Sequence, residues 1–474
     1  MYSNYDNERR RKPSIIFRTD SYKWGHWMQY LPNTQNVYSY LESRNGAKFN
    51  NTVFFGLQYY LKEYLAGRVL NQLDIQRASK LAEKHLGPGR FNVDGWQYIL
   101  DKHYGKLPLL IRSVPEGLPI PVSNCQLTVE VTDQKVPWLT NFVESLLMKI
   151  WSPSAVATLS REIKILIKHY LEVTSDSVDG LPYMLHDFGY RGDSSEESAE
   201  INGAAHLINF RGTDTILSLL FPEDFYNAPK DYCPGESVLA TEHSIMTSRL
   251  EKGEFDVVRH ILNTTPDGIL SVVIDSYDYR RFIKETAKLP ELATWLNRTP
   301  TNKIVFRPDS GDPVSTSLDV AGLIAELFGV TLNTKGYRIF NQQTGMLWGD
   351  GIQYDGIRNI LHALKNNGYA ASNIVFGMGG GLHTSCTRDT QRNAFKCSAQ
   401  CYDNQWHDVY KKPLDPTKAS KSGRLSLIQD ANGRFMTVPE IIKDKNQDLL
   451  TPVFKNGEIL KEYSWDEICS NAKL

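Results

Sequence analysis

Short apolar runs that open into polar loops recur along the middle of the chain. Most of these runs are followed by stretches with the apolar spacing of an amphipathic helix, such as 320–328 and 355–368. The runs with their loops occupy 184–192, 206–215, 238–244, 269–278, 303–313, 346–353 and 374–389. Strand, loop and helix repeated in this order are typical of βα units, so the pattern predicts an α/β fold with a parallel sheet.

Charged side chains stand at the C-terminal end of nearly every predicted strand. In α/β barrels the loops after the strands carry the chemistry, because they meet at one end of the barrel. Asp, Gly and Ser also make good turns and caps, and one or two such ends would need no other explanation. So many strand ends that carry Asp, Arg or His predict one shared polar pocket.

The flanking segments have a different pattern. Residues 108–133 are rich in Pro and β-branched residues and indicate antiparallel strands. Helical spacing is found at 52–67, 91–105, 137–151 and 154–173, the last with Ser154 as its expected N-cap. We expect a central α/β barrel domain at 151–389 and a second, α+β domain assembled from 14–150 and 390–474. Residues 1–13 are expected to be a flexible tail.

Composition and charge narrow the possible functions. The 474 residues are 41% hydrophobic and 23% charged, as in ordinary soluble proteins. A net charge of −1 argues against nucleic-acid or membrane surfaces, so a phosphate would need a local basic pocket. No apolar run has the length of a membrane span and no signal-peptide pattern is present, which makes the cytoplasm the expected location. Cys397 and Cys401 lack a second pair at zinc spacing, and the six cysteines indicate no disulfide scaffold.

The segment 374–389 is the most informative pattern in the chain. An apolar run leads into Gly377, Gly379 and Gly380, and a helix is expected to follow with Arg388 about two turns in. Glycines allow a turn in which several backbone N–H groups face one point, and a helix N-terminus adds partial positive charge. The pattern favours a phosphate-binding loop. The alternative is that the glycines only allow a tight turn and bind no ligand.

Two further sets of residues have catalytic or phosphate-binding character. Arg307 is a planar fork that fits phosphate oxygens, and the nearby Asp309 suits sugar hydroxyls or a magnesium-bound water. The alternative is a surface Arg–Asp pair in a turn. His243 has Glu242 beside it, and Asp275 ends a neighbouring strand. A histidine oriented by a carboxylate is a base or a phosphate acceptor, whereas a lone histidine is more often structural.

Three more residues are suited to a flat ring that carries an amide. Asp214 ends another predicted strand, and a carboxylate without a fixed cation partner accepts hydrogen bonds from an amide NH₂. Phe188 and Tyr22 are aromatic residues in polar loops, where they either stack on a planar ligand or simply pack.

The order of these motifs resembles the nicotinamide phosphoribosyltransferase family. The matching pieces run from about residue 17 to the C-terminus and include DSYK at 20–23, HDFGYRG at 186–192, RPDSG at 307–311, GGG at 379–381 and TRD at 387–389. The family consists of homodimeric type II phosphoribosyltransferases with the active site at the dimer interface. The resemblance implies formation of nicotinamide mononucleotide from nicotinamide and phosphoribosyl diphosphate, in NAD salvage.

The resemblance also implies a role for each candidate residue. Phe188 and Tyr22, the latter from the other subunit, would hold the nicotinamide ring between them. Asp214 would accept a hydrogen bond from the carboxamide, near Ser271 and Arg307. Asp309 would hold ribose hydroxyls. The remaining ribose, phosphate and diphosphate contacts would come from Gly349, Asp350, Gly379, Gly380, Arg44, Arg191, Arg388, Lys396 and Lys411.

ATP and Mg²⁺ are further implied by the resemblance. His243 would be phosphorylated by ATP, with Glu242 and Asp275 in support, and Mg²⁺ would be held mainly by the diphosphate. The chain departs from the family pattern at Ala394, where vertebrate members carry a serine, and at Met378, before the glycines. Loss of one hydroxyl donor would weaken phosphate binding by about 1 kcal/mol.

Two alternative functions stay open at this point. A nicotinate phosphoribosyltransferase would share the fold, but the acid would be repelled by Asp214, which favours the amide. The other alternative is a binding or scaffold protein with an inactive site. His243, Arg307 and Asp309 are all present, which speaks against inactivity but agrees equally with an additional binding role.

Overall fold

A computed structural model of the chain describes residues 14–412, 414, 419–440 and 447–474. The chain forms two compact units. The barrel unit comprises Leu159–Pro222, Pro229–Cys386 and Lys473–Leu474, and the α+β unit comprises Met1–Thr158, Glu223–Ala228 and Thr387–Ala472. The sequence placed the domain boundaries at 150/151 and 389/390. The expected tail, 1–13, lies outside the described residues.

The barrel unit is built on a seven-stranded parallel sheet with the strand order β7-β6-β14-β13-β10-β9-β8. The strands are β6 (Leu185–Asp187), β7 (Gly212–Thr213), β8 (Leu239–Ala240), β9 (Ile269–Val273), β10 (Lys303–Arg307), β13 (Thr344–Trp348) and β14 (Ile374–Met378). An isolated parallel bridge between Gly212 and Glu236 joins the β7 edge to the segment before β8, so the sheet curls back on itself. The predicted α/β barrel is thereby confirmed.

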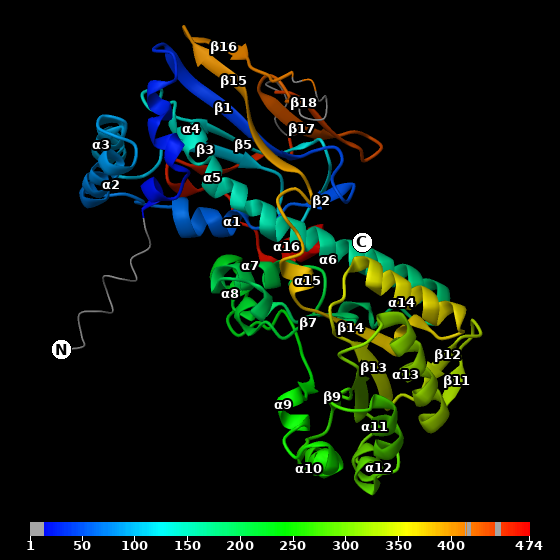
Figure 1. Ribbon diagram of the computed structural model, residues 1–474. Coiled ribbons are helices and arrows are strands. Elements are labelled where there is room, and N and C mark those ends of the chain that lie inside the picture. The colour runs from blue at the N-terminus through cyan, green and yellow to red at the C-terminus, as the bar shows by residue number, and fades with distance from the viewer. Residues whose placement is uncertain (1–13, 413, 415–418, 441–446) are drawn as a thin grey trace, which may run out of the picture. The chain divides into compact units, whose positions relative to one another are not determined.

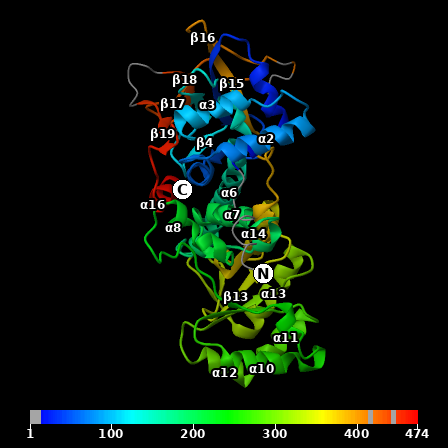
Figure 2. The same ribbon diagram turned by 90° about the vertical axis from the view of Figure 1, so that its left-hand side faces the viewer.

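Helices follow most of these strands, as the alternation in the sequence predicts. They are α7 (Glu196–Leu207), α9 (His243–Met246), α10 (Glu254–Thr264), α11 (Tyr279–Thr286), α12 (Pro290–Leu296), α13 (Pro313–Phe328), α14 (Tyr354–Asn366) and α15 (Gly380–His383), with a hairpin of β11 (Val330–Leu332) and β12 (Arg338–Phe340) after α13. α10 packs on α12, and α11 and α14 pack on α13 (Figure 2). In β10, Ile304 and Phe306 are fully buried, while Lys303, Val305 and Arg307 alternate with them and face the barrel interior.

The α+β unit is built on a seven-stranded antiparallel sheet with the order β16-β15-β1-β5-β3-β19-β20. The strands are β1 (Thr34–Ser43), β3 (Leu109–Ser113), β5 (Cys125–Val131), β15 (Asn393–Tyr402), β16 (Gln405–Asp408), β19 (Thr451–Lys455) and β20 (Glu458–Ile459). β1 and β15 lie side by side in Figure 1, so both ends of the chain contribute to this sheet. This agrees with the predicted α+β fold built from the two terminal segments.

Helices and two small hairpins complete the α+β unit. The hairpins are β2 (Asn51–Val53) with β4 (Pro119–Pro121) and β17 (Leu425–Gln429) with β18 (Phe435–Pro439). The helices are η2 (Ser21–Met28), α1 (Leu57–Tyr60), α2 (Gln72–His85), α3 (Val93–His103), α4 (Leu139–Phe142), α5 (Glu144–Leu147) and α16 (Trp465–Asn471); α6 (Trp151–Thr174) begins in this unit and α8 (Phe221–Phe225) ends in it. A capping box between Asn71 and Asp74 accounts for the start of α2.

Two helix predictions are wrong in detail. Residues 52–67 were expected to form one helix, but β2 covers the start, and Gly56 with φ 100° separates it from α1. Ser154 is not an N-cap, because α6 begins at Trp151. Its hydroxyl instead donates to Phe55 O and accepts from Phe55 N, both at 3.1 Å, and so ties the helix to the loop after β2.

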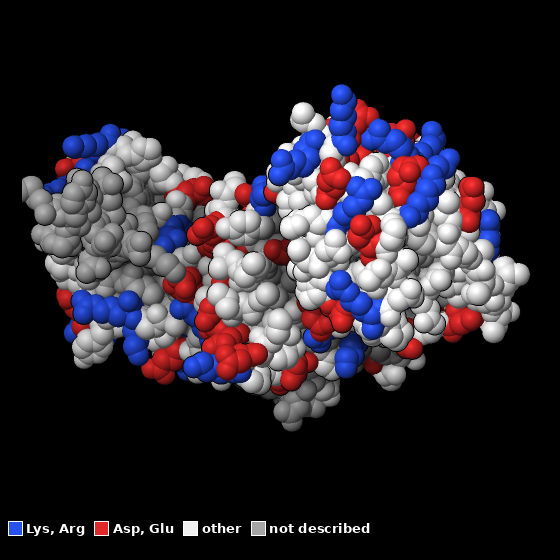
Figure 3. All heavy atoms as spheres, turned by 90° about the horizontal axis from the view of Figure 1, so that it is seen from below, with Lys and Arg blue, Asp and Glu red and all other residues white. Residues whose placement is uncertain are grey.

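The face of the molecule drawn in Figure 3 shows no concentration of one charge. In Figure 3, Lys and Arg side chains are interspersed with Asp and Glu over the visible face, in line with the net charge of −1. No helix among the described residues is both long and apolar enough to cross a bilayer.

Candidate active site

A cavity of about 420 Å³ occupies the interior of the barrel unit. Alternate residues line it, namely Ile269 and Ser271 on β9 and Lys303, Val305 and Arg307 on β10. Because each strand residue rises about 3.3 Å, the cavity follows β10 for about 13 Å. Side chains from the other strands and loops complete the lining: Tyr183, His186, Phe188, Asp214, Glu236, Ser237, Val238, Ala240, Leu347 and Val375. The cavity is therefore a long, mostly apolar slot with polar groups at selected points.

Phe188 follows β6, and its ring forms part of the cavity wall. Its backbone N–H donates to Met378 O at 3.0 Å, which ties the loop after β6 to β14. A Cβ atom at Gly377 would lie 2.0 Å from Phe188 Cε2, and one at Gly349 would lie 3.5 Å from the same atom. The ring therefore packs directly on glycine backbone, and Gly377 in particular is required for its position.

Asp214, Ser271 and Arg307 bring polar atoms to the same cavity. Asp214 Oδ1 accepts a hydrogen bond from Ser237 Oγ, and within the described residues no ion pair engages this carboxylate. Arg307 donates from Nη2 to Thr241 O at 2.6 Å. Arg307 Nε and Ser271 Oγ are buried without a hydrogen-bond partner in the part of the chain that the structure describes. Since buried polar groups are nearly always paired in native proteins, these atoms indicate a polar ligand.

His243 and Asp275 form a pair at the ends of β8 and β9. His243 Nε2 lies 3.1 Å from Asp275 Oδ1, and Asp275 Oδ2 accepts a hydrogen bond from Ser310 Oγ. The carboxylate is buried, whereas the imidazole is 46% exposed. Glu242 Oε1 accepts a hydrogen bond from Ser244 Oγ. If the Nε2 proton points to Asp275, the Nδ1 lone pair of an accessible imidazole is left for a reactant.

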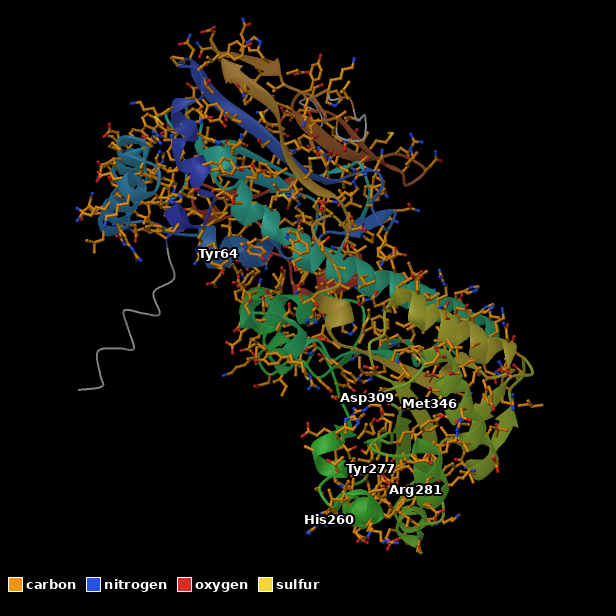
Figure 4. All side chains as sticks on the ribbon, viewed as in Figure 1. Tyr64, His260, Tyr277, Arg281, Asp309 and Met346 are labelled. Atoms are coloured by element: carbon orange, nitrogen blue, oxygen red, sulfur yellow. The ribbon has the colours of Figure 1, made fainter. Side chains whose placement is uncertain are left out.

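Asp309 and Asp350 follow β10 and β13, and Figure 4 labels Asp309 just beyond its strand. Burial raises the pKa of Asp350, and the charges of Asp309 and Asp275 raise it further, so the three carboxylates act on one another. A Cβ atom at Gly349 would lie 3.3 Å from Asp309 Oδ1. Within the described residues, no group of three or more His, Cys, Asp or Glu could hold a metal ion by itself. Carboxylate oxygens suit Mg²⁺, so these residues fit a magnesium ion that takes its other ligands from water or phosphate.

The glycine-rich turn leads from β14 through Gly379 into α15. A Cβ atom at Gly192 would lie 2.9 Å from Gly380 Cα, so the loop that carries Arg191 packs against the turn. A Cβ atom at Gly381 would lie 2.5 Å from a backbone oxygen, that of Ile352. Close backbone approach therefore requires glycine at Gly381 in this turn and at Gly192 in the loop that packs against it.

The expected place of Arg388, two turns into a helix after the glycines, is wrong. α15 has a single turn and ends at His383, and Arg388 belongs to the α+β unit. Glycine is a poor helix former, so the run of three glycines favours a short helix.

Four of the expected phosphate-binding cations lie in the α+β unit and are called the cation cluster: Arg44, Lys396, Lys411 and Arg388. Burial lowers the pKa of Lys396, and the charges of Arg44, Lys411 and Arg388 lower it further, against the opposing effect of Glu144. Arg44 Nε and Nη2 are buried without a hydrogen-bond partner among the described residues, and Glu42 Oε1 is 3.7 Å from Nε. Cations that repel one another and keep unused donors are suited to a multivalent anion such as diphosphate.

Tyr22 stands on η2 in the same unit and is 58% exposed. The buried Lys23 anchors this helix, with Nζ 2.7 Å from both Asn141 O and Glu144 Oε2. The Tyr22 and His26 rings lie with their centroids 5.0 Å apart. The tyrosine is therefore held on a fixed helix with much of its ring accessible to a ligand or a partner.

Sequence reasoning missed a buried charged residue of the barrel unit, which lies beside the loop of Phe188 and Arg191. His383, the last residue of α15, lies between the carboxylates of Asp187 and Asp193 with no exposed side-chain surface. The available signal was a histidine after the glycines and two aspartates that flank the loop of Phe188 and Arg191. Spacing alone could not bring them together, because nearly two hundred residues separate them in the chain.

Comparison with known proteins finds relatives over the whole chain. Residues 183–458 match the nicotinate phosphoribosyltransferase (NAPRTase) family, and 14–111 match the N-terminal domain of nicotinamide phosphoribosyltransferase. The chain is 41% identical to a nicotinamide phosphoribosyltransferase of Xanthomonas campestris, over 97% of this chain and 98% of the relative. It is 32% identical to one of Acinetobacter baylyi, over 95% of each. The solved nicotinate-nucleotide pyrophosphorylase of Pyrococcus furiosus has a similar fold, with a TM-score of 0.62 at 15% identity over 100% of this chain and 97% of that one.

Proposed function

The chain belongs to the nicotinamide phosphoribosyltransferases within the nicotinate phosphoribosyltransferase family, and from this premise we propose that it forms nicotinamide mononucleotide and diphosphate from nicotinamide and phosphoribosyl diphosphate. The observation that carries the choice of substrate is the barrel cavity, which both Asp214 and Phe188 line. An aromatic face and an acceptor carboxylate suit a flat ring that bears an NH₂ group.

Nicotinamide fits the polar atoms of this cavity. The amide NH₂ donates to Asp214, and its oxygen accepts from Ser271 Oγ or Arg307 Nε, both of which lack partners among the described residues. Nicotinate would instead place a second carboxylate beside Asp214, and like charges repel. The site therefore favours the amide over the acid.

The complete site is proposed to form in a homodimer. Tyr22 of the partner subunit would cover the face of the nicotinamide ring opposite Phe188, and the partner's cation cluster would bind the phosphate groups. Support comes from the accessible ring of Tyr22 and from the partnerless buried donors of Arg44 within the described part of the chain.

In the proposed reaction the bond from ribose C1 to the diphosphate oxygen breaks, and the pyridine nitrogen bonds to C1. The nitrogen lone pair is already free, so no general base is required. Phe188 orients the ring, Asp309 holds ribose hydroxyls, and the cation cluster stabilises negative charge on the departing diphosphate. Mg²⁺, held by the diphosphate beside Asp309 and Asp350, would supply further charge neutralisation.

His243 is proposed as a phosphate acceptor that couples ATP to this reaction. Its Nδ1 lone pair would attack the γ-phosphorus of ATP, the bond to ADP would break, and ADP would leave. Asp275 would accept the Nε2–H hydrogen bond at 3.1 Å and stabilise the phosphorylated ring. Support comes from the exposure of the imidazole and the burial of its carboxylate partner.

The first test is product formation from phosphoribosyl diphosphate and Mg²⁺ with nicotinamide or nicotinate, each with and without ATP. Mononucleotide from nicotinamide, increased by ATP, is the expected result, and His243→Ala should abolish the increase and the associated ATP hydrolysis. Turnover of nicotinate alone would overturn the role of Asp214. Turnover of neither substrate would favour a binding protein.

A further inference from the structure

One buried histidine joins the two loops on which the proposed site depends. His383 Nδ1 lies 2.5 Å from Asp193 Oδ2 in a hydrogen-bonded ion pair, and Nε2 lies 3.0 Å from Asp187 Oδ1, an ion pair whose angles do not make a hydrogen bond. The side chains of His383 and Asp187 are fully buried, and that of Asp193 is 5% exposed. A single ring thus bridges two carboxylates in the protein interior.

His383, Asp187 and Asp193 form a triad whose charges shift the pKa of His383 and that of Asp187. Burial lowers the pKa of His383, but the charges of Asp187 and Asp193 outweigh this effect and raise the pKa to about 9. Burial raises the pKa of Asp187, but His383 lowers it to about 2. His206, which faces the triad from α7, has its pKa lowered to about 4 by burial, and burial also lowers the pKa of the nearby His186. At neutral pH the His383 imidazolium is therefore the cation that faces the two carboxylates.

The two carboxylates hold both ends of one short loop. Asp187 ends β6, and its Oδ1 also accepts from Gly189 N at 2.7 Å. Asp193 follows the turn of Arg191, and Asn202 Nδ2 donates to its Oδ1 at 3.2 Å. Phe188 and Arg191 lie between these anchors.

The histidine itself belongs to the other loop. It ends α15, which begins directly after Gly379. A Cβ atom at Gly189 would lie 2.7 Å from the His383 ring, so the loop backbone is in contact with the imidazole. The triad thereby connects the wall of the base cavity with the glycine-rich turn.

We propose that His383 is a positioning residue for nicotinamide binding: its two ion pairs, the His383 clamp, fix the loop of Phe188 and Arg191 against the glycine-rich turn. The role rests on the proposed function. A gain in folding stability does not explain the buried ion pairs of His383, because replacing buried ion pairs by apolar residues is often neutral or stabilising. A defined loop position is what the paired charges contribute.

The clamp has a definite pH dependence. The pKa of His383 in the folded protein is raised above its ordinary value of 6.5 to about 9. The contribution of His383 to the free energy of unfolding is therefore complete below pH 6.5, and it is lost as the pH rises through about 9. Above that pH the imidazole is neutral, the loop is less firmly held, and KM for nicotinamide should rise.

The test is Asp193→Asn, which keeps the size and one acceptor oxygen of the side chain but removes one charge. The pKa of His383 should fall, so the alkaline limb of kcat/KM for nicotinamide should move down by about one pH unit. KM for nicotinamide at pH 8 should rise about tenfold, with a smaller change in kcat. The matched control is His103→Gln, which removes an imidazole 2.8 Å from Asp133 in the α+β unit and should leave the limb unchanged.

An unmoved alkaline limb with unchanged KM in Asp193→Asn would overturn the clamp. Melting temperature against pH gives a readout that does not require turnover. The difference between the wild type and Asp193→Asn should shrink as the pH rises from 7 to 10, and parallel curves would also contradict the proposal. If the wild type fails to convert nicotinamide, the proposed function fails, and the melting curves still decide whether the clamp exists.

Discussion

The contact between Gly377 and Phe188 gives the sharpest test of the base cavity. In Gly377→Ala, the new Cβ atom would lie 2.0 Å from Phe188 Cε2. Carbon atoms pack at about 3.5 Å, so the ring edge must retreat by about 1.5 Å. When a substitution away from the reacting atoms misplaces a bound reactant by about 1 Å, the rate falls by about 100-fold. We therefore expect kcat/KM for nicotinamide to fall about 100-fold, mainly through KM.

Gly377→Ala should leave the protein folded, with only a modest loss of stability. Gly377 does not have a positive φ, so alanine is compatible with the backbone there. Overpacking costs about 1–3 kcal/mol, which a melting curve would register as a modest loss. The matched control is Gly322→Ala in α13, where an added Cβ atom has no neighbour within 4 Å. It should raise stability by up to about 1 kcal/mol and leave kinetics unchanged.

A double-mutant cycle separates the ring from other effects of the substitution. Phe188→Ala removes the side chain that the new methyl group would strike, so adding Gly377→Ala to it should have almost no further effect on nicotinamide affinity. Affinity is measured by calorimetry with nicotinamide, and activity by mononucleotide formation. Wild-type affinity in Gly377→Ala, or full additivity in the cycle, would refute a nicotinamide site on the Phe188 ring.

Three further substitutions test the polar atoms of the two units. Asp214→Asn should raise kcat/KM for nicotinate relative to nicotinamide at least tenfold, because it removes the like-charge repulsion; unchanged selectivity in a competition assay would be contrary evidence. Ser271→Ala should leave stability equal or about 1 kcal/mol higher, since Ser271 Oγ has no partner among the described residues, while nicotinamide affinity falls several-fold by calorimetry. Lys396→Met should raise KM for phosphoribosyl diphosphate about tenfold and flatten its salt dependence, with nicotinamide affinity unchanged; a similar loss for both substrates would contradict this division.

The barrel was predictable because its signal is local and repeated. Each apolar run ends in a polar loop, and parallel strands bring such loops to one end of the sheet whatever the details of packing. Phe188, Asp214 and Arg307, which lie at or just after strand ends, line one cavity for this reason, whereas Ser271 lies within β9 and was implied only by the family resemblance. Alternation also explains why Ile304 and Phe306 are buried while their neighbours face the interior.

The errors arose where tertiary contacts override local pattern. Ser154 has a good N-cap side chain, yet the helix already begins at Trp151 and the hydroxyl pairs with Phe55. Arg388 follows a glycine turn that supports only one helical turn. The ion pairs of His383 could not be predicted from sequence spacing, because its partners follow another strand nearly two hundred residues away. Pairing of distant residues decides the cases of Ser154 and His383, and a single sequence does not record such pairing, whereas the short helix before Arg388 follows from its own glycines.

Both units contain buried polar atoms without hydrogen-bond partners among the described residues, and substrate binding accounts for those named below in both units. Ser271 Oγ and Arg307 Nε in the barrel unit, and Arg44 Nε and Nη2 in the α+β unit, lack partners within the described residues. A buried polar atom that stays unpaired costs about 1–3 kcal/mol, and a fold gains nothing from several of them. A bound ligand that supplies the missing hydrogen-bond partners removes this cost. The free energy of unfolding should therefore rise when substrate binds. Nicotinamide should therefore satisfy Ser271 Oγ and Arg307 Nε in the barrel unit, and phosphoribosyl diphosphate should satisfy the guanidinium of Arg44 in the α+β unit.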